Sequence, residues 1–398
     1  MNRLDQKFWK NFAAKYWEKK PLAIKDVQSP LREMDAAVVF GLLVKFADLC
    51  RARGDSAGFK FYVDGAKLHE DEVLELLPEK SDRTLLGYHE RMNEIFEDYG
   101  LVCDELLQVN AEKQGRLIEF TRDLYSQVGF PNRFAEMGLY LGNYKKTPFG
   151  VHVDGCGVFS FPVAGTKRFR LWRNEYGAKH PDLDRAFEYK KHLKASELMT
   201  AKPGDMTYWP SSAWHIAESD GEFSATWSLG VWVDKPHAEV VSEVLGPLVG
   251  ALLGKNAKLG ATPIKNFPAA SGEVADLPPL LSQTSKVLGH LDAEELERRL
   301  REYWLGHLSA QGLKVAPAAK FRLGKNLRLA QPSSPILWAV EGRTLRCGFA
   351  GQVFAAPYSK ALVDQLKLLN SGQTVPLKAA DRKLFTSLGN AGALAHLK

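Results

Sequence analysis

Residues 145–172 read KKTPFGVHVDGCGVFSFPVAGTKRFRLW and contain the features on which the fold prediction depends. His152 and Asp154 flank Val153, and alternate residues of an extended strand point to the same face. An imidazole and a carboxylate can therefore bind one metal ion from one side. His215, at the end of a second stretch, KPGDMTYWPSSAWH, is the third candidate ligand. Two histidines and one carboxylate, with the opposite positions open, are the ligand set of non-haem Fe(II) oxygenases.

A lysine in an apolar strand is the second feature. A small turn at residues 164–166 follows an apolar run, and the alternating segment KRFRLW then occupies residues 167–172. Strand periodicity places Lys167 on the same face as Phe169 and Leu171, opposite the two arginines. A buried ammonium group is costly unless an anion meets it. The sequence therefore predicts a ligand carboxylate at Lys167 if this face looks into a barrel.

The order of elements favours the α+β class. Helices and short strands do not alternate regularly, which argues against a doubly wound sheet and for a mainly β barrel with a helical coat. A helical segment and a C-terminal winged-helix-like module are expected to follow. The expected elements include a helix over residues 90–99 and one strand over residues 344–354.

Taken together, these motifs resemble one family. His152-x-Asp154, Lys167 fifteen positions after the first histidine in a Gly-x-Lys-Arg turn, and His215 after a Pro-Gly-Asp turn are similar to the JmjC, or cupin-like, 2-oxoglutarate oxygenases. The likeness is greatest to the hydroxylase branch that acts on protein side chains, such as the ribosomal-protein and asparaginyl hydroxylases. The resemblance implies a double-stranded β-helix (cupin, jelly-roll) barrel.

The resemblance also implies cofactors and site residues. The two histidines and Asp154 would hold Fe(II), and Lys167 would bind the far carboxylate of the cosubstrate 2-oxoglutarate. Thr147 corresponds to a threonine that reaches a cosubstrate carboxylate in relatives, with two extra residues before His152 here. Ser228 is a further candidate contact to the cosubstrate, with core packing as the alternative.

The remaining histidines and cysteines offer few other ligands. Cys156 lies two residues beyond Asp154 and is either a fourth metal ligand or a small buried thiol. The four cysteines form no Cys-x-x-Cys pair, so neither a disulfide framework nor a zinc ribbon fits. His180 and His192 lie in a Lys- and Asp-rich segment and are expected at the surface.

The predicted function is a dioxygenase that hydroxylates an amino-acid side chain of a protein or peptide. Three alternatives stay open: a hydroxylase of a free amino acid or small metabolite, a lysine demethylase, and a non-catalytic cupin binding module. The intact ligand set together with Lys167 argues against the last of these.

Charge is spread unevenly along the chain. The whole sequence carries +6, but residues 311–398 hold thirteen Lys or Arg against three acidic residues, a net +10, so the first 310 residues carry −4. A basic module on a mildly acidic body predicts an acidic partner, either RNA, a ribosome or an acidic peptide. The alternative is a solvated basic surface.

Length and hydropathy bound the organisation. A chain of 398 residues predicts two or three domains. We expect N-terminal helices and the first barrel strands over 1–136, a catalytic core over 137–235, a helical segment over 236–312 and the basic module over 313–398. The helical segment would form homodimer contacts, by resemblance. No segment has the roughly 20 apolar residues of a membrane span, and the N-terminus has no secretion signal, so a cytoplasmic location is expected.

Overall fold

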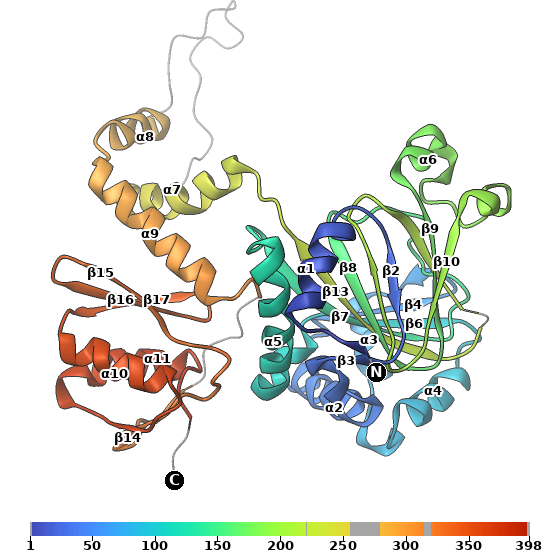
Figure 1. Cartoon of the computed structure of the whole chain (residues 1–398), viewed down its shortest axis with the longest axis horizontal. Helices are drawn as coiled ribbons and strands as arrows, with labels where there is room; N and C mark the ends of the chain where they lie inside the picture. Colours follow the sequence, from blue (N-terminus) through green and yellow to red (C-terminus); the bar gives the residue numbers. More distant parts are fainter. Residues whose placement is uncertain (1, 220, 255–278, 314–319, 396–398) are drawn as a thin grey trace, which may run out of the picture.

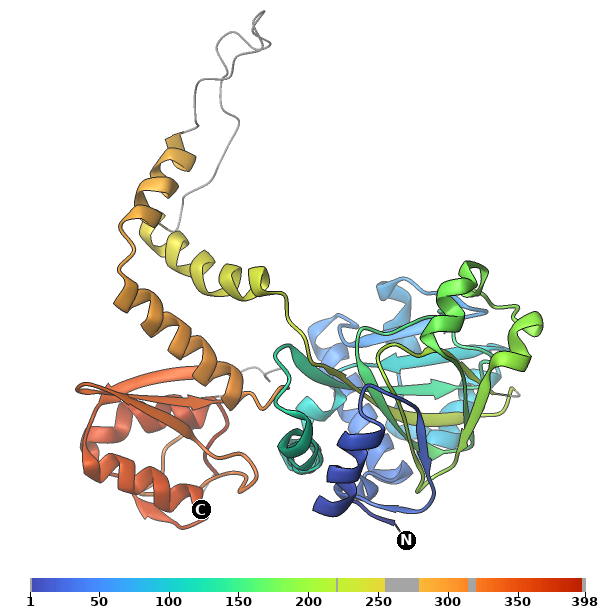
Figure 2. The same ribbon diagram turned by 45° about the horizontal axis from the view of Figure 1, so that its top comes forward.

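The computed structural model describes residues 2–219, 221–254, 279–313 and 320–395. They form a β-barrel part and a smaller C-terminal part, which lie side by side (Figures 1 and 2). The predicted class, a mainly β core with helices, is confirmed by the strands and helices described below.

Two antiparallel sheets make up the barrel. The larger sheet has eight strands in the order β2-β11-β8-β13-β7-β6-β4-β5, and the smaller has three in the order β10-β9-β12. The strands of the larger sheet are β2 (Leu22–Ile24), β4 (Phe59–Val63), β5 (Ala66–Lys67), β6 (Tyr99–Cys103), β7 (Phe134–Gly142), β8 (Gly157–Ala164), β11 (Met206–Trp209) and β13 (Ser224–Trp232). Those of the smaller sheet are β9 (Lys167–Trp172), β10 (Glu197–Ala201) and β12 (Trp214–Glu218).

The predicted alternation in β9 explains how the smaller sheet packs. Lys167, Phe169 and Leu171 are buried, whereas Arg168 and Arg170 are partly exposed. Phe169 and Leu171 belong to an apolar cluster that also contains residues of β8 and β11 in the larger sheet. The inward face of β9 therefore looks across the barrel interior, as the sequence predicts.

A helical coat covers the other face of the larger sheet. Trp9 and Phe12 of α1 are buried, and their rings pack against Phe159 of β8 at centroid distances of 6.2 and 5.5 Å. Aromatic residues at helical spacing thus bury one stripe of α1 on the sheet. The coat consists of α1 (Gln6–Lys15), α2 (Ala36–Arg53), α3 (Glu70–Val73), α4 (Leu85–Asn93) and α5 (Ala111–Val128), and α6 (Asn174–Lys179) follows β9.

The C-terminal part begins with the helices α7 (His237–Leu253), α8 (Pro279–Gly289) and α9 (Ala293–Ser309). A sheet of β15 (Leu337–Glu341), β16 (Thr344–Phe349) and β17 (Gln352–Pro357) follows, then α10 (Lys360–Asn370) and α11 (Arg382–Asn390). A second small sheet pairs β14 (Asn326–Leu327) with β18 (Val375–Pro376). The strands and helices from β14 to α11 share an apolar core of their own, and the winged-helix-like character expected of residues 313–398 stays a prediction.

Contacts fix the C-terminal part to the barrel part beside α5 (Figure 1). The Nε2 atom of His307 in α9 lies 2.9 Å from the carbonyl oxygen of Pro131, and Arg133 forms an ion pair with Glu239 of α7 at 2.7 Å. Ala135 and Leu313 form a parallel β-bridge. These contacts join residues more than 100 positions apart in the sequence.

Two predicted elements are wrong. Residues 90–99 are not one helix, because α4 ends at Asn93 and Tyr99 begins β6, which pairs with β4 and β7. Residues 344–354 are not one strand, because Ala350 and Gly351 have positive φ angles of 46° and 79° and form a tight turn between β16 and β17. Two consecutive left-handed residues are typical of a hairpin turn.

The predicted division into four segments stays a prediction. Its first boundary, at residue 136, lies inside β7, and strands from both sides of that boundary share the larger sheet. Among the described helices, none combines the length and the apolar composition that crossing a membrane requires.

Candidate active site

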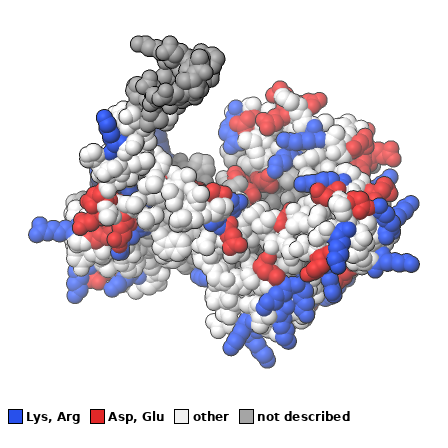
Figure 3. All heavy atoms as spheres, turned by 90° about the horizontal axis from the view of Figure 1, so that it is seen from above, with Lys and Arg blue, Asp and Glu red and all other residues white. Residues whose placement is uncertain are grey.

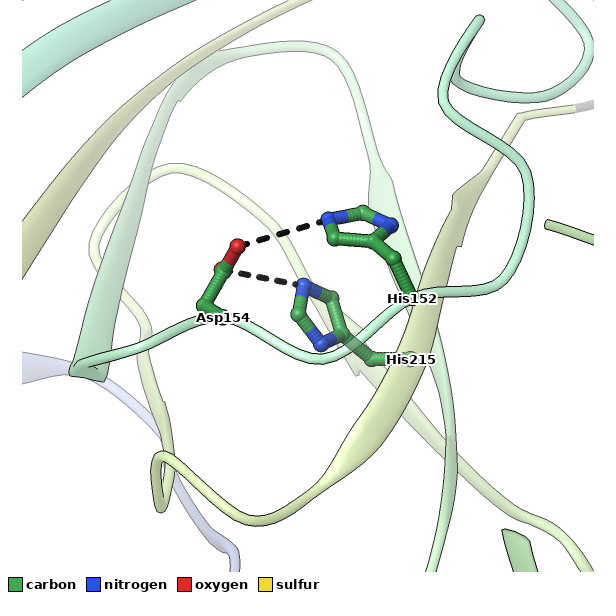
Figure 4. A group of neighbouring side chains, drawn as sticks. All are labelled: His152, Asp154 and His215. Atoms are coloured by element: carbon green, nitrogen blue, oxygen red, sulfur yellow. Dashed lines mark ion pairs between the residues drawn. The ribbon is translucent and has the colours of Figure 1, made fainter. Parts of the chain in front are cut away.

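The three predicted metal ligands lie together inside the barrel (Figure 4). His152 and Asp154 come from the loop between β7 and β8, and His215 comes from β12. The Asp154 carboxylate is 3.5 Å from Nε2 of His152 and 3.3 Å from Nε2 of His215. One ligand atom from each residue lies within 4.8 Å of the others. The donor set and its spacing fit a divalent metal ion such as Fe(II).

Backbone pairing brings the two histidines together. The amide of His152 donates to the carbonyl oxygen of His215 at 3.0 Å, and the amide of His215 donates back at 2.8 Å. This pair is an isolated antiparallel bridge, not the regular strand that the His-x-Asp spacing predicts. The reciprocal bonds set the two imidazole rings side by side, with centroids 4.4 Å apart.

Hydrogen bonds fix which ring nitrogen of each histidine is free. The Nδ1 atom of His152 lies 2.9 Å from the carbonyl oxygen of Gly150, and that of His215 lies 3.1 Å from the carbonyl oxygen of Ala213. A carbonyl oxygen only accepts, so each Nδ1 carries the proton. The lone pair of each Nε2 atom is then available to the metal.

The protonation states suit metal binding. Burial lowers the pKa of His152, and the nearby His215 lowers it further, so the imidazole is neutral at neutral pH. Burial would raise the pKa of Asp154, but its hydrogen bond to His215 and the charges of both histidines outweigh this, and the pKa lies below its usual value. Neutral imidazoles and an ionised carboxylate are the forms that bind metal.

Glu18, just after α1, holds the turn that leads to His215. Its carboxylate accepts hydrogen bonds from the Tyr208 hydroxyl at 3.2 Å, from the Ser211 amide at 3.2 Å and from the Ser211 hydroxyl. Ser211 belongs to the same turn between β11 and β12 as Ala213, whose carbonyl orients the His215 ring. Glu18 therefore anchors the backbone on which one metal ligand depends.

Replacing Glu18 with alanine is expected to weaken metal binding about tenfold, because partners that orient a ligand are worth about 10- to 100-fold in affinity. A Co(II) titration followed by absorbance measures the affinity. Glu33→Ala is the matched control, because Glu33 is exposed and pairs with Arg116 away from the barrel interior. Equal affinities in the Glu18 and Glu33 variants would contradict the positioning role.

Lys167 is buried beside the ligands, with 2% of its surface exposed. Its Nζ atom donates a hydrogen bond to the Tyr144 hydroxyl at 2.5 Å and lies 4.2 Å from the centroid of the same ring. Burial lowers the pKa of Lys167 to about 7. No carboxylate of the described residues forms an ion pair with this ammonium group, so an anionic ligand would complete its surroundings.

All of the predicted site residues line one cavity of about 420 Å³. Thr147 and Ser228 both contribute to its wall, together with the three ligands and Lys167. The Thr147 hydroxyl is buried and has no hydrogen-bond partner within the described residues. The structure thus brings Thr147 and Ser228 next to the metal ligands, and their contacts to a cosubstrate stay predictions.

Three further polar side chains in this cavity were not predicted from the sequence. Tyr144 bonds Lys167, and the Thr226 hydroxyl and the Trp209 indole N–H are buried without a hydrogen-bond partner among the described residues. Each lies in or just after a strand whose other residues are buried, so the neighbouring sequence does not mark it as a site residue. Thr226 could have been predicted from strand alternation, because it faces the same side of β13 as the predicted site residue Ser228.

Cys156 also lines the cavity, but the potential metal-binding group found among the described residues comprises only the two histidines and Asp154. The thiol is 3% exposed, and burial raises its pKa, so it is protonated at neutral pH. Of the two uses considered for Cys156, the small buried thiol fits these surroundings.

His192 departs from its predicted place at the surface. Only 4% of it is exposed, and its ring nitrogens lie 3.0 Å from the Tyr176 hydroxyl and 3.2 Å from the Asp182 carboxylate. A Lys-rich neighbourhood in the sequence hid this burial, because the segment folds back on itself and His192 packs beneath its own charged neighbours.

Comparison with protein families and solved structures agrees with this geometry. Residues 119–239 match the JmjC domain family. The matched region spans β7 to β13 and so includes all three candidate ligands and Lys167. The predicted resemblance is therefore confirmed.

Solved structures share the fold over nearly the whole chain. An X-ray structure of ycfD from E. coli has 16% identity and a TM-score of 0.54. Structures of YcfD, named a ribosomal oxygenase from Escherichia coli, in complex with cobalt and 2-oxoglutarate and with cobalt and succinic acid have 16% and 17% identity, each with a TM-score of 0.52. Each match covers 97% of both chains. At such identities the likeness establishes a common fold that includes the C-terminal part. No curated protein matches the sequence.

Proposed function

We propose that the protein is an Fe(II)- and 2-oxoglutarate-dependent dioxygenase that hydroxylates an amino-acid side chain of a protein or peptide. The observation that carries the proposal is the combination of an open His-Asp-His ligand set with a buried, unneutralised lysine in one cavity. The ligand set fits Fe(II), and the lysine fits the far carboxylate of 2-oxoglutarate. The JmjC domain and the YcfD complexes with cobalt and 2-oxoglutarate or succinic acid support both cofactors.

The chain's own residues bind, orient and shield the reactants. Bound iron would let 2-oxoglutarate react with dioxygen: one oxygen atom would enter a substrate C–H bond and the other the succinate, which forms together with CO2. Lys167, held by Tyr144, fixes one end of the cosubstrate by a charge-assisted hydrogen bond. Thr147 and Thr226 offer buried hydroxyl groups to the same cavity. The aromatic walls Trp209 and Phe169 keep water away from the ligands.

Access to the metal site supports a macromolecular substrate. Val153, between the two ligands of the His-x-Asp motif, is 38% exposed, so the ligand loop reaches the protein surface. A shallow second cavity of about 600 Å³ lies along the same loop and is lined by Lys145, Lys146 and Pro148. We infer that a side chain of another protein enters the site beside this loop while its backbone lies along the surface. The description of YcfD as a ribosomal oxygenase makes a ribosomal protein one candidate substrate.

Fe(II)-dependent succinate formation should rise when cell-lysate protein is added, and mass spectrometry should find a peptide with one added oxygen. That peptide should disappear when the His152→Ala variant replaces the wild type, because the variant lacks one ligand. Stimulation by free amino acids or metabolites alone would favour the small-molecule alternative. Loss of a methyl group from lysine would favour a demethylase. A folded, iron-loaded protein that binds no 2-oxoglutarate would contradict the proposal and leave a cupin binding module.

The cytoplasmic location and the homodimer formed through the helical segment stay predictions. The acidic partner of the basic C-terminal module, either RNA, a ribosome or an acidic peptide, also stays a prediction.

A further inference from the structure

The C-terminal module carries basic side chains without acidic partners, at a distance from the active site. We define the basic surface as the side chains of Arg322, Lys325, Arg328, Lys378, Arg382 and Lys383. All six are exposed, and none forms an ion pair with another described residue. Asp381 is the one acidic residue in the segments 320–329 and 375–390 that carry them.

Hydrogen bonds draw these segments together. The amide of Leu377 donates to the carbonyl oxygen of Lys325 at 2.8 Å, which places Lys325 beside Lys378. Arg382 and Lys383 begin α11 four residues further on. At the other end of α11, Asn390 accepts a hydrogen bond from the amide of Phe321 at 2.8 Å. The segment 321–325 therefore runs alongside α11. Arg328 lies beside the chain that follows α11, where the amide of Ala395 donates to its carbonyl oxygen at 2.9 Å.

The segment that contributes Arg322, Lys325 and Arg328 exposes its charges between inward apolar residues. Leu327 and Leu329 are buried in the core of the module, and Phe321 and Leu323 pack partly against it. The residues between them face solvent, and Lys325 lies at a bend. Since an extended chain rises about 3.3 Å per residue, Arg322 and Arg328 are at most about 20 Å apart, with Lys325 between them. Charges spread over such a length suit an extended polyanion better than a single carboxylate.

On the opposite side of the C-terminal part, acidic and basic side chains pair with one another. Seen from above, acidic side chains gather over the region of α9 (Figure 3). There Arg298 pairs with Glu295 and with Glu302, and Arg301 pairs with Glu297. Those charges neutralise one another. In Figure 1, β14, which belongs to one of the segments that carry the basic surface, lies at the far end of the C-terminal part from α9. Arg343, Lys360 and Lys367 are further exposed basic residues of this part outside the basic surface.

We propose that the basic surface binds the phosphodiester backbone of a single-stranded nucleic acid. Lysine and arginine side chains that line a path along the surface can track successive phosphates, and the release of counterions drives this binding without base recognition. An acidic peptide is the less suitable partner. Leu323 and Leu327, the apolar side chains between Arg322 and Arg328, pack against the core of the module, so they are not free to hold the apolar neighbours of carboxylates in a peptide.

Fluorescence anisotropy of the full chain with labelled single strands of RNA and of DNA, about 20 nucleotides long, tests the proposal. The double variant Arg322→Glu/Arg328→Glu should bind at least about tenfold more weakly than the wild type and show a shallower dependence on salt. The matched control is Lys360→Glu/Lys367→Glu. It makes the same change of net charge at exposed positions of α10 in the same module.

Several outcomes would overturn the proposal: no binding of either strand at about 50 mM salt, equal losses in the two double variants, or polyglutamate bound more tightly than both strands. Binding of RNA alone or of both strands supports it and identifies the source of the backbone. Succinate formation is measured on the same samples. The basic surface lies outside the active-site cavity, so a failed binding assay leaves the proposed oxygenase function untouched, and the reverse also holds.

Discussion

Replacing His152 with alanine is expected to abolish Fe(II)-dependent succinate formation and to remove measurable Co(II) binding. The Nε2 atom of His152 is one of three donors that lie within 4.8 Å of one another, and its Nδ1 atom is already used by Gly150. With that donor gone, two ligands remain, and no other His, Cys, Asp or Glu of the described residues joins the group. The loss should exceed the roughly 10- to 100-fold effect of removing a partner that only orients a ligand.

The fold should survive this change. In the metal-free protein, burial and the neighbouring His215 already lower the pKa of His152, so the imidazole contributes little charge to the site. Without metal, the melting temperatures of variant and wild type should therefore lie close together. Saturating Co(II) should stabilise the wild type by about 2.7 kcal/mol at 100 times the dissociation constant and leave the variant unchanged.

His237→Ala provides the matched control, because His237 is exposed at the start of α7 and lies outside the cavity. It should keep both metal binding and succinate formation. A His152 variant that still gains stability from Co(II) would show that the metal is held elsewhere, and the assignment of the ligand set would fall.

Local patterns in the sequence predicted the parts of the site that depend on local geometry. The His-x-Asp spacing put two ligands together, and strand alternation placed Lys167 on the buried face of β9. Both features depend on residues only one or two positions apart. The periodicity of the chain is enough to orient such side chains relative to one another.

Contacts between distant segments escaped prediction for the opposite reason. Glu18 meets Tyr208 across 190 positions, and in the sequence it is one of several charged residues that follow α1. Tyr144 ends a run of core residues, and only the fold shows its hydroxyl at the Lys167 ammonium group. The mistaken helix over residues 90–99 has the same cause, because pairing of β6 with β4 and β7 outweighs the local preference at Tyr99.

The Lys167→Met variant is expected to bind 2-oxoglutarate at least about 100-fold more weakly than the wild type. Methionine cannot form the charge-assisted hydrogen bond, so the far carboxylate of 2-oxoglutarate would be buried without a partner. Methionine keeps an unbranched apolar stem and lacks only the terminal amine position. Isothermal titration of the Co(II)-loaded protein with 2-oxoglutarate measures the loss. Affinity within a few-fold of the wild type would remove Lys167 from the cosubstrate site.

The same residue makes cosubstrate binding depend on pH. Burial lowers the pKa of Lys167 to about 7 in the ligand-free protein, so the amine is mostly neutral above that pH. A bound carboxylate requires the ammonium form, and binding therefore takes up a proton. The affinity of the wild type should fall by up to tenfold per pH unit above pH 7. The titration heat should also vary with the ionisation enthalpy of the buffer.

Without cosubstrate, Lys167→Met should be more stable than the wild type. The unfolded chain holds the lysine proton up to about pH 10.4, whereas the folded protein releases it near pH 7. The buried lysine therefore opposes folding fully below pH 7, and its cost fades as the pH rises towards the unfolded pKa. Denaturant unfolding at pH 6 should show a gain on the order of 1–3 kcal/mol.

Lys60→Met is the control for this gain, because Lys60 also lines the cavity but its side chain is 45% exposed and pairs with Asp104 at 2.7 Å. Removing an exposed, paired lysine should give no increase in stability. A Lys167 variant that loses stability as well as 2-oxoglutarate would mean that the lysine serves the fold. If the Lys167 variant gains stability but no longer binds 2-oxoglutarate, Lys167 serves cosubstrate binding and destabilises the ligand-free protein.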